Sequence, residues 1–347
     1  MLNYAIVVAT RNRLDMLKVS LPLFAHQTRR AERLVVVDRS DDHSSVRDYC
    51  ESLRHDSPVP IEVLVGHEAN LPSQRNQGLD RVHEDVTMYP DDDSLWYPDT
   101  AERLMAVYDA DVNRRYGAVS ANDVYAAPGT AAEEVPQPRT RITDLPAVMR
   151  VRNWIEAALV PQPFEVYGAE RTAELAPAAL ADGLQFQLVG TIGGYRMSFR
   201  TEVAKSLRFD RVLGSRIGYA VHEDKDMGLR VLRAGSLIAV APGARVFHNV
   251  APGRRANGFS YGFFHILNYA YICRRVFPDE SRAMSVIRRY LTYKVFLYSL
   301  RRHDEYARDV HRGAKTAMAE FDNVIRARPD ELEVAYGDVC DRNFRGA

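Results

Sequence analysis

The first 121 residues alternate between short apolar runs and longer amphipathic ones. The short runs are rich in Val, Ile and Tyr, which favour β-strands, and the longer runs repeat apolar residues at helical spacing. Continuous apolar strands that alternate with helices are typical of a parallel sheet covered on both faces. The pattern predicts strands at 4–10, 33–38, 61–66, 85–89 and 116–121, and helices at 14–27, 44–55, 71–83 and 100–111.

The pattern changes after residue 121. Residues 122–190 are rich in Ala, Pro and Glu, and we expect an excursion from the sheet there, with one helix around 151–159. Regular structure is predicted again as a strand at 193–200, a helix at 218–235, two short strands around a Pro-Gly turn in 236–250, and helices over 258–327. We therefore expect an α/β domain, 1–250, followed by a helical region, 251–347.

Three adjacent carboxylates, Asp91, Asp92 and Asp93, follow the predicted strand 85–89. Adjacent like charges repel, and a turn needs only one Asp or Asn to bond its own backbone. The triplet is therefore either a solvated turn or a cation site. Thr10 and Asp38 also stand at the ends of predicted strands, and parallel sheets bind ligands at that edge. Thr10, Asp38 and the acidic triplet are therefore expected at the same edge of the sheet.

A second acidic cluster, Glu223, Asp224 and Asp226, lies near the start of the predicted helix 218–235. Acidic residues at an exposed helix N-terminus stabilise it by about 0.3–1 kcal/mol each, so the cluster has a purely structural explanation. It also supplies carboxylates for chemistry, and the sequence pattern alone leaves both explanations open.

Composition narrows the class of partner. The formal net charge is zero, which gives no reason to expect a nucleic-acid partner, and three widely spaced cysteines indicate a reducing compartment without a disulfide framework. The N-terminus lacks a signal-peptide pattern, so a cytoplasmic location is expected. Residues 286–302 mix aromatic, aliphatic and basic side chains, which suits either an ordinary amphipathic helix or one resting on an anionic membrane. Peripheral membrane contact through 258–302 therefore stays open, as does the oligomeric state.

Six stretches, in this order, resemble the family 2 nucleotide-sugar glycosyltransferases, whose fold is called GT-A. They are IVVATRNR, LVVVDRSDD, NLPSQRNQGL, MYPDDDSLWYPD, GGYRMSFRTEV and HEDKDMGLRVLRAG. The resemblance covers about residues 4–121 and 190–250. The C-terminal helices are loosely similar to those of bacterial rhamnosyl- and galactofuranosyltransferase-like members. The resemblance implies a Rossmann-like, mostly parallel sheet flanked by helices, with a helical C-terminal extension.

The resemblance also implies where a nucleoside-diphosphate sugar binds. Thr10, with Arg11 beside it, and Asp38 would contact the base, typically uracil or thymine, so a UDP- or dTDP-sugar is expected. Arg75 would approach the base or the diphosphate. Arg39 departs from the family, which usually has a small or amide residue after the strand-end Asp.

A divalent ion is implied at the acidic triplet. Asp91 and Asp93 form the family's DxD pair; Asp92 would face the ribose or sugar, and Asp93 would bind Mg²⁺ or Mn²⁺, which prefer carboxylate and phosphate oxygens. His248 is either a hydrogen-bonded structural residue or a further metal ligand, as in the galactofuranosyltransferase-like members. Pro90 stands where the family mostly has Leu.

The acceptor side is implied by the second acidic cluster. Asp224 would be the general base that removes the proton of an acceptor hydroxyl, on a glycan or a lipid-linked acceptor, and direct attack would invert the anomeric centre. Glu223 and Asp226 would orient the acceptor, with Gly194 and Trp154 beside it.

Arg254 and Arg255 follow His248 in a glycine-containing loop, APGRR, that either closes over the diphosphate or is a solvated basic loop. Leu267-Asn268 stands where the bacterial subgroup has an Arg-Asn pair.

Three alternatives to a glycosyltransferase were weighed against these residues. A nucleotidyltransferase would usually carry a Gly-rich basic loop after the first strand, and TRNRLDM has no run of glycines. A non-catalytic nucleotide-sugar-binding protein would be favoured by loss of the triplet or of Asp224, and both are present. A membrane-tethering adaptor explains neither acidic cluster.

Overall fold

The computed structural model describes residues 1–129, 159–214, 220–250, 256–277, 281–301 and 303–344. These residues form two compact units. The first unit contains the described residues up to 129, together with 168–214 and 223–250; the second contains 159–167, 220–222 and those from 256 onward. The helix expected at 151–159 falls almost entirely outside the described residues.

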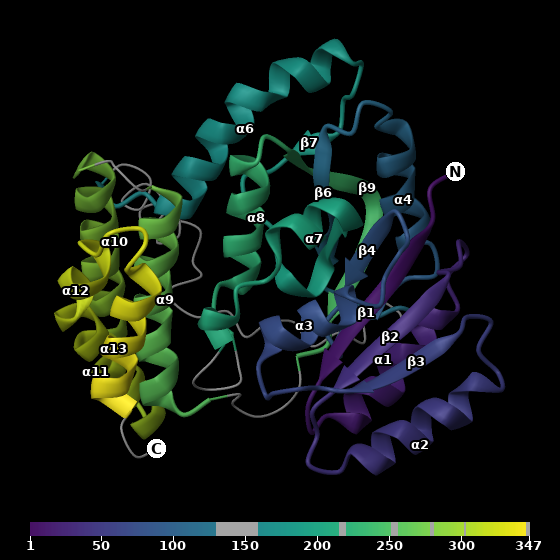
Figure 1. Cartoon of the computed structure of the whole chain (residues 1–347), viewed down its shortest axis with the longest axis horizontal. Helices are drawn as coiled ribbons and strands as arrows, with labels where there is room; N and C mark the ends of the chain where they lie inside the picture. The colour runs from purple at the N-terminus through teal and green to yellow at the C-terminus, as the bar shows by residue number, and fades with distance from the viewer. Residues whose placement is uncertain (130–158, 215–219, 251–255, 278–280, 302, 345–347) are drawn as a thin grey trace. The chain divides into compact units, whose positions relative to one another are not determined.

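The strands of the first unit join into one mixed sheet in the order β3-β2-β1-β4-β8-β6-β9-β5, and β7 pairs with β9 (Figure 1). The strands are β1 (Tyr4–Thr10), β2 (Arg33–Asp38), β3 (Ile61–Val65), β4 (Val86–Tyr89), β5 (Ser94–Trp96), β6 (Tyr116–Val124), β7 (Gln187–Leu188), β8 (Met197–Arg200) and β9 (Leu237–His248). The helices are α1 (Leu14–Ala25), α2 (His43–Arg54), α3 (Leu71–Leu79), α4 (Thr100–Ala110), α7 (Thr201–Leu207) and α8 (Glu223–Arg233); α6 (Pro163–Ala181) belongs partly to each unit.

The expected architecture, a mostly parallel sheet flanked by helices, is confirmed. Strands β1, β2, β3 and β4 are parallel, and Thr10 lies opposite Asp38 in the β1–β2 register. The polar ends of these strands therefore share one edge of the sheet. Strand β8 runs antiparallel between β4 and β6, and β5 runs antiparallel to β9.

Alternation along β1 explains why both faces of the sheet are covered. Tyr4, Ile6 and Val8 pack with apolar residues of α1, α2 and α4, whereas Ala5 and Val7 pack with those of α3, α7 and α8. A Cβ added at Gly78 of α3 would lie 2.3 Å from Cγ1 of Val7. This glycine therefore allows α3 to lie directly against β1, which brings the preceding turn of α3 close to the edge of the sheet.

The prediction of two short strands in 236–250 is wrong, because β9 runs through the Pro-Gly pair as one strand. Gly243 takes a φ of +73°, and the pairing with β6 changes register between Ser120 and Asn122. Strand β6 continues alongside to Val124 and pairs with β9 on both sides of the irregularity. The backbone therefore accommodates the Pro-Gly pair as a bulge inside a strand.

Other elements also differ from the sequence-based expectation. Helix α8 begins only at Glu223, and β8 begins at Met197 after a short 3₁₀ turn, η3 (Gly194–Arg196). Helix α6 was not predicted, because Gly168 and Pro177 inside it are unfavourable in a helix interior.

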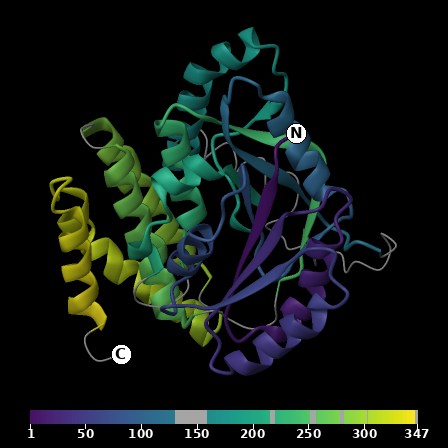
Figure 2. The same ribbon diagram turned by 45° about the vertical axis from the view of Figure 1, so that its right-hand side comes forward.

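The second unit is helical, as expected, and its elements are coloured green to yellow in Figure 2. They are α9 (Gly258–Val276), α10 (Ser281–Ser299), α11 (Glu305–Ala319), α12 (Phe321–Ile325) and α13 (Leu332–Phe344). Helices α9 and α11 approach closely, since a Cβ at Gly262 would lie 2.0 Å from the Val310 carbonyl oxygen. None of the helices in the described residues combines the length and apolar character that crossing a membrane requires.

Candidate active site

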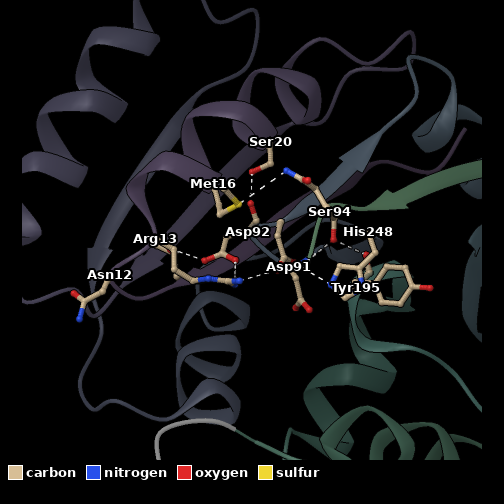
Figure 3. A network of polar contacts seen from close by, with 12 residues as sticks. Asn12, Arg13, Met16, Ser20, Asp91, Asp92, Ser94, Tyr195 and His248 are labelled. Atoms are coloured by element: carbon tan, nitrogen blue, oxygen red, sulfur yellow. Dashed lines mark hydrogen bonds and ion pairs between the residues drawn. The ribbon is translucent and has the colours of Figure 1, made fainter. Parts of the chain in front are cut away.

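The acidic triplet forms a rigid turn between β4 and β5. The Ser94 backbone N–H donates to the Asp91 carbonyl oxygen at 3.0 Å, and the Ser94 hydroxyl accepts from the Asp91 N–H at 3.1 Å. The Ser20 hydroxyl donates to the Asp92 carbonyl oxygen at 2.7 Å (Figure 3). Asp92 and Asp93 are 3% and 0% exposed. The solvated-turn explanation is therefore wrong for these two carboxylates.

Arg13 supplies a cation to the two buried carboxylates, and its role was missed from the sequence. Its Nη1 donates to Asp92 Oδ1 and its Nη2 to Asp93 Oδ2, the latter at 2.8 Å (Figure 3). The Thr10 hydroxyl donates to Asp92 Oδ2 at 2.8 Å. Burial nevertheless raises the pKa of Asp92 to about 7, with the neighbouring Asp93 and Asp91 acting in the same direction and Arg13 and Thr10 against it.

Asp91, Asp93 and His248 lie together at the end of the sheet. Each offers one ligand atom, and these atoms all lie within 4.8 Å of one another. His248 Nε2 is 3.3 Å from Asp93 Oδ1, and the His248 ring stacks on Tyr195 at 4.4 Å between centroids. The β5–β9 pairing produces this proximity, because it places Ser94 opposite His248.

The donor set suits a divalent ion. Two carboxylates and an imidazole are acceptable ligands for Mn²⁺, and Mg²⁺ would draw mainly on the carboxylates. Ligand atoms about 2.1 Å from a common ion lie at most about 4.2 Å apart. The three ligand atoms, all within 4.8 Å of one another, are therefore close to the spacing that one ion requires.

Arg75 connects the triplet to the second acidic cluster. Its Nη2 donates to Asp91 Oδ1 at 2.8 Å and its Nη1 to Glu223 Oε1 at 2.9 Å, and Arg75 is only 2% exposed. Burial lowers the pKa of Arg75, but Asp91 and Glu223 together outweigh it, so the net shift is upward. Burial raises the pKa of Glu223 to about 7, and Arg75 opposes this rise.

Asp224 is half-buried beside this ion-pair network. Its Oδ2 accepts from the Gly194 N–H at 2.9 Å, and its Oδ1 accepts from the Lys225 N–H at 2.7 Å. A Cβ added at Gly194 would lie 3.6 Å from both Arg75 Nη2 and the Asp224 Cβ, and 3.7 Å from Glu223 Oε1. Gly194 thus lies among these three side chains, where any larger residue would narrow the space around Asp224.

Asp38 braces the loop that leads into α2. Its Oδ1 accepts from the Ser40 N–H at 2.9 Å and from the Ser40 hydroxyl at 2.5 Å, and its Oδ2 lies 2.6 Å from His43 Nδ1. Arg11 is exposed. A pocket of about 420 Å³ lies beside this loop, lined by Asn12, Arg13, Leu14, Asp15, Met16, Ser40, Asp42, Ser45 and Val46.

The structure does not bring every expected residue to this cluster. Asp226 is fully buried and forms an ion pair with Arg230 at 2.7 Å. Its carboxylate is therefore not placed to orient an acceptor. Trp154, Arg254 and Arg255 lie outside the described residues.

Comparisons with known proteins were made against this geometry. Residues 5–131 match the sequence model of the family described as Glycosyl transferase family 2. S. aureus TarS 1–349 in complex with UDP-GlcNAc is similar in structure, with a TM-score of 0.54 and 14% identity over 99% of this chain and 92% of that one. The mannosyltransferase PcManGT from Pyrobaculum calidifontis, in complex with GDP-Man and Mn²⁺, has a TM-score of 0.52 and 13% identity over 100% of this chain and 88% of that one. No curated protein sequence matches the chain significantly.

Structural likeness at this identity establishes the fold, which is GT-A. The family match covers β1 to β6, including the acidic triplet, Arg13 and Arg75. Residues 5–131 therefore match a family 2 glycosyltransferase domain on a GT-A fold, which supports a glycosyl-transfer enzyme.

Proposed function

We propose that the chain moves a sugar from a nucleoside-diphosphate sugar to a hydroxyl of a glycan or lipid-linked acceptor, with inversion of the anomeric centre. UDP and dTDP are the favoured nucleotides. The observation that carries the proposal is that Arg75 joins a candidate metal site at Asp91 to the acidic start of α8. The similar structures contain UDP-GlcNAc in one case and GDP-Man with Mn²⁺ in the other, which supports a nucleotide-sugar donor and a divalent ion.

The nucleotide is proposed to lie at the carboxyl ends of β1 and β2, where open α/β sheets bind ligands. The pocket beside Asn12, Arg13 and Ser40 supports this placement. Since both oxygens of Asp38 are engaged by Ser40 and His43, we assign Asp38 to holding the loop that contacts the base.

Asp91, Asp93 and His248 are proposed to hold Mg²⁺ or Mn²⁺, which would neutralise the charge that develops on the departing diphosphate. Among the described residues, Arg13 pairs with Asp92 and Asp93, and Arg75 pairs with Asp91 and Glu223. Arg13 takes Oδ2 of Asp93, and Oδ1 faces His248, so the arginine and an ion can use different oxygens of one carboxylate.

Asp224 is proposed as the general base. Two backbone N–H groups fix its carboxylate, and its partial exposure lets an acceptor hydroxyl reach it. Glu223 forms an ion pair with Arg75. This pairing suits Glu223 to orienting the site more than to proton transfer. One base acting in a direct displacement inverts the anomeric centre, and no carboxylate nucleophile is required.

Calorimetric titration with UDP, with and without Mn²⁺, tests the donor site. We expect Mn²⁺ to strengthen UDP binding, and we expect Asp93→Ala to lower the affinity measured with Mn²⁺ by at least about tenfold, because a divalent ion depends on this carboxylate. Asp56→Ala, at an exposed position in the turn after α2, is the matched control and should bind like the wild type.

If UDP does not bind, the same titration with dTDP and GDP decides whether only the nucleotide was misassigned. Absence of binding for all three with Mn²⁺ present would overturn the proposed donor. Metal-independent binding that survives Asp93→Ala would instead overturn the metal site alone.

Peripheral attachment to an anionic membrane is proposed for one face of α10. Arg289, Thr292, Phe296 and Leu300 follow at steps of three and four residues, so they share a face. Phe296 and Leu300 are 55% and 66% exposed, and the arginine at the other end of this face is exposed as well. Exposed apolar side chains next to basic ones are suited to the interface of an anionic bilayer.

Flotation with lipid vesicles tests this attachment. We expect the protein to float with vesicles of phosphatidylcholine and phosphatidylglycerol but not with phosphatidylcholine alone, and the double variant Phe296→Ser/Leu300→Ser to bind about tenfold more weakly, since two apolar side chains no longer leave water. Val334→Ser on α13 also removes an exposed apolar side chain and should not change binding. Equal flotation of all three proteins would refute attachment through this face.

A further inference from the structure

The dipeptide Val221-His222 directly precedes Glu223 and Asp224 in the chain, yet it belongs to the second unit. His222 has a φ of +70°, a left-handed conformation that is uncommon for a residue other than glycine. Such a conformation persists only where the surrounding structure imposes it. The residues that contact this dipeptide therefore impose its conformation.

Asn268 of α9 holds the backbone of the dipeptide. Asn268 is completely buried, and its Nδ2 donates to the Val221 carbonyl oxygen at 3.0 Å. Its Oδ1 accepts from the Tyr336 hydroxyl of α13 at 2.6 Å. Tyr336 is itself buried and meets the Tyr271 ring edge-on at 5.0 Å between centroids. One amide thus connects the C-terminal helix α13 to residue 221.

The side chain of His222 is held as well. Its ring meets three rings edge-on: His265 at 4.6 Å, Tyr269 at 5.5 Å and Phe164 at 5.8 Å between centroids. Phe164 and Tyr269 stack on each other at 3.8 Å. With the Val221 carbonyl and the His222 ring both fixed, few backbone rotations remain before Glu223.

We propose that Asn268 is a positioning residue for the two carboxylates at the start of α8. This inference rests on the proposed function, in which Asp224 accepts a proton and Glu223 pairs with Arg75. By holding the Val221 carbonyl, Asn268 restrains the backbone that leads directly into Glu223. The reaction slows steeply when catalytic groups are displaced by 1 Å or less. The hydrogen bonds of Asn268 to Val221 and Tyr336, which we call the tether, therefore control turnover without contacting the substrate.

Two variants distinguish the Asn268–Val221 hydrogen bond from the Asn268–Tyr336 hydrogen bond. Asn268→Leu removes the hydrogen bonds to Val221 and Tyr336 and keeps a similar volume, whereas Tyr336→Phe removes the Tyr336 bond and leaves the bond to Val221. Asn343→Leu is the matched control, because Asn343 also lies on α13 and its amide donates to Val339 and Glu320 rather than to residues 221–222. The readouts are amide hydrogen exchange, UDP affinity with Mn²⁺, and UDP release from UDP-GlcNAc with water as acceptor.

For Asn268→Leu we expect amide exchange in 221–229 to become at least about tenfold faster, with exchange in α1 and α4 unchanged. UDP affinity should stay within about twofold of the wild type, and kcat for UDP release should fall at least about tenfold at unchanged KM. Tyr336→Phe should change the exchange rate in 221–229 and kcat for UDP release by less than about threefold each. Asn343→Leu should change neither the exchange rate nor kcat.

Unchanged exchange in 221–229 for Asn268→Leu would overturn the tether. Faster exchange spread evenly over α9, α11 and α13, with kcat per folded molecule unaffected, would show that Asn268 only stabilises the helices. Failure of the proposed function looks different, since the wild type would then bind no UDP or release none. The exchange result would still decide whether Asn268 holds residues 221–229.

Discussion

Replacement of Asp224 by Asn is expected to lower kcat by about 10²–10⁴-fold, the usual contribution of a positioned general base. Asn has nearly the same shape as Asp, and its carbonyl oxygen can still accept from the Gly194 N–H, although the bond from the Lys225 N–H is lost. The amide cannot take a proton from the acceptor. Initial rates of sugar transfer at saturating donor, on the acceptor that gives turnover with the wild type, measure the effect.

UDP affinity with Mn²⁺ is the internal control for this variant, and it should stay within about twofold because no proposed donor contact is removed. Asp226→Asn is the matched substitution two residues along the same helix. Since Asp226 pairs with Arg230, it should lower stability and leave the turnover of folded protein unchanged. If Asp224→Asn retained more than about a third of the wild-type kcat, Asp224 would not be the base.

Replacement of Arg75 by Leu is expected to lower the free energy of unfolding by about 3–5 kcal/mol, because it leaves buried carboxylates without their partner. Glu223 loses its ion pair at 2.9 Å and Asp91 loses the one at 2.8 Å. Urea denaturation of the metal-free protein measures the change. Arg81→Leu, just beyond α3, removes an exposed ion pair with Glu62 and should cost less than about 1 kcal/mol.

The double variant Arg75→Leu/Glu223→Gln should recover part of this loss, since the unpaired buried charge is then absent. The loss should also depend on pH in a defined direction. The folded-state pKa of Glu223 is about 7, above the ordinary value of 4.5, so the protonated form favours the folded state and that stability is lost as pH rises through 7. Removing Arg75 raises this pKa further.

The destabilisation by Arg75→Leu should therefore be greatest at alkaline pH and diminish as pH falls below 7. An effect equal to that of Arg81→Leu at pH 8 would show that water or a rearranged side chain compensates both carboxylates.

The parallel half of the sheet and its polar edge were predictable from sequence for one physical reason. Buried parallel strands must be continuously apolar, so the residue at which polarity returns marks the strand end. Thr10, Asp38 and the triplet were located in this way, and the β1–β2 register places the first two opposite each other. Of the two explanations left open for the triplet, a solvated turn or a cation site, the burial of Asp92 and Asp93 excludes the first for these two residues, and Arg13 supplies a cation there.

The identity of that cation was not predictable. Arg13 lies 79 residues from Asp92 in sequence, and nothing in its spacing distinguishes it from the exposed Arg11. Only the packing of α1 beside β5 brings its guanidinium to the triplet. Arg75 was singled out, but as a contact to base or diphosphate, whereas its guanidinium lies between Asp91 and Glu223. Ion pairs between residues far apart in sequence depend on the topology of the fold. They produce no periodic pattern in the sequence.

Strand β9 carries a consequence for how the protein is made. In the described sheet β5 lies at the edge and pairs with β9 alone, and β9 is the last strand among the described residues. While the chain is still on the ribosome, the segment after Asp93 therefore has no strand to pair with until residue 248 has emerged. The family-matched part, 5–131, can collapse early around β1–β4, because its contacts are comparatively local. The bonds that Arg13, Ser20 and Ser94 make to the acidic turn lie within this part, whereas His248 is synthesised later, so the proposed ion-binding cluster is completed only when β9 pairs with β5.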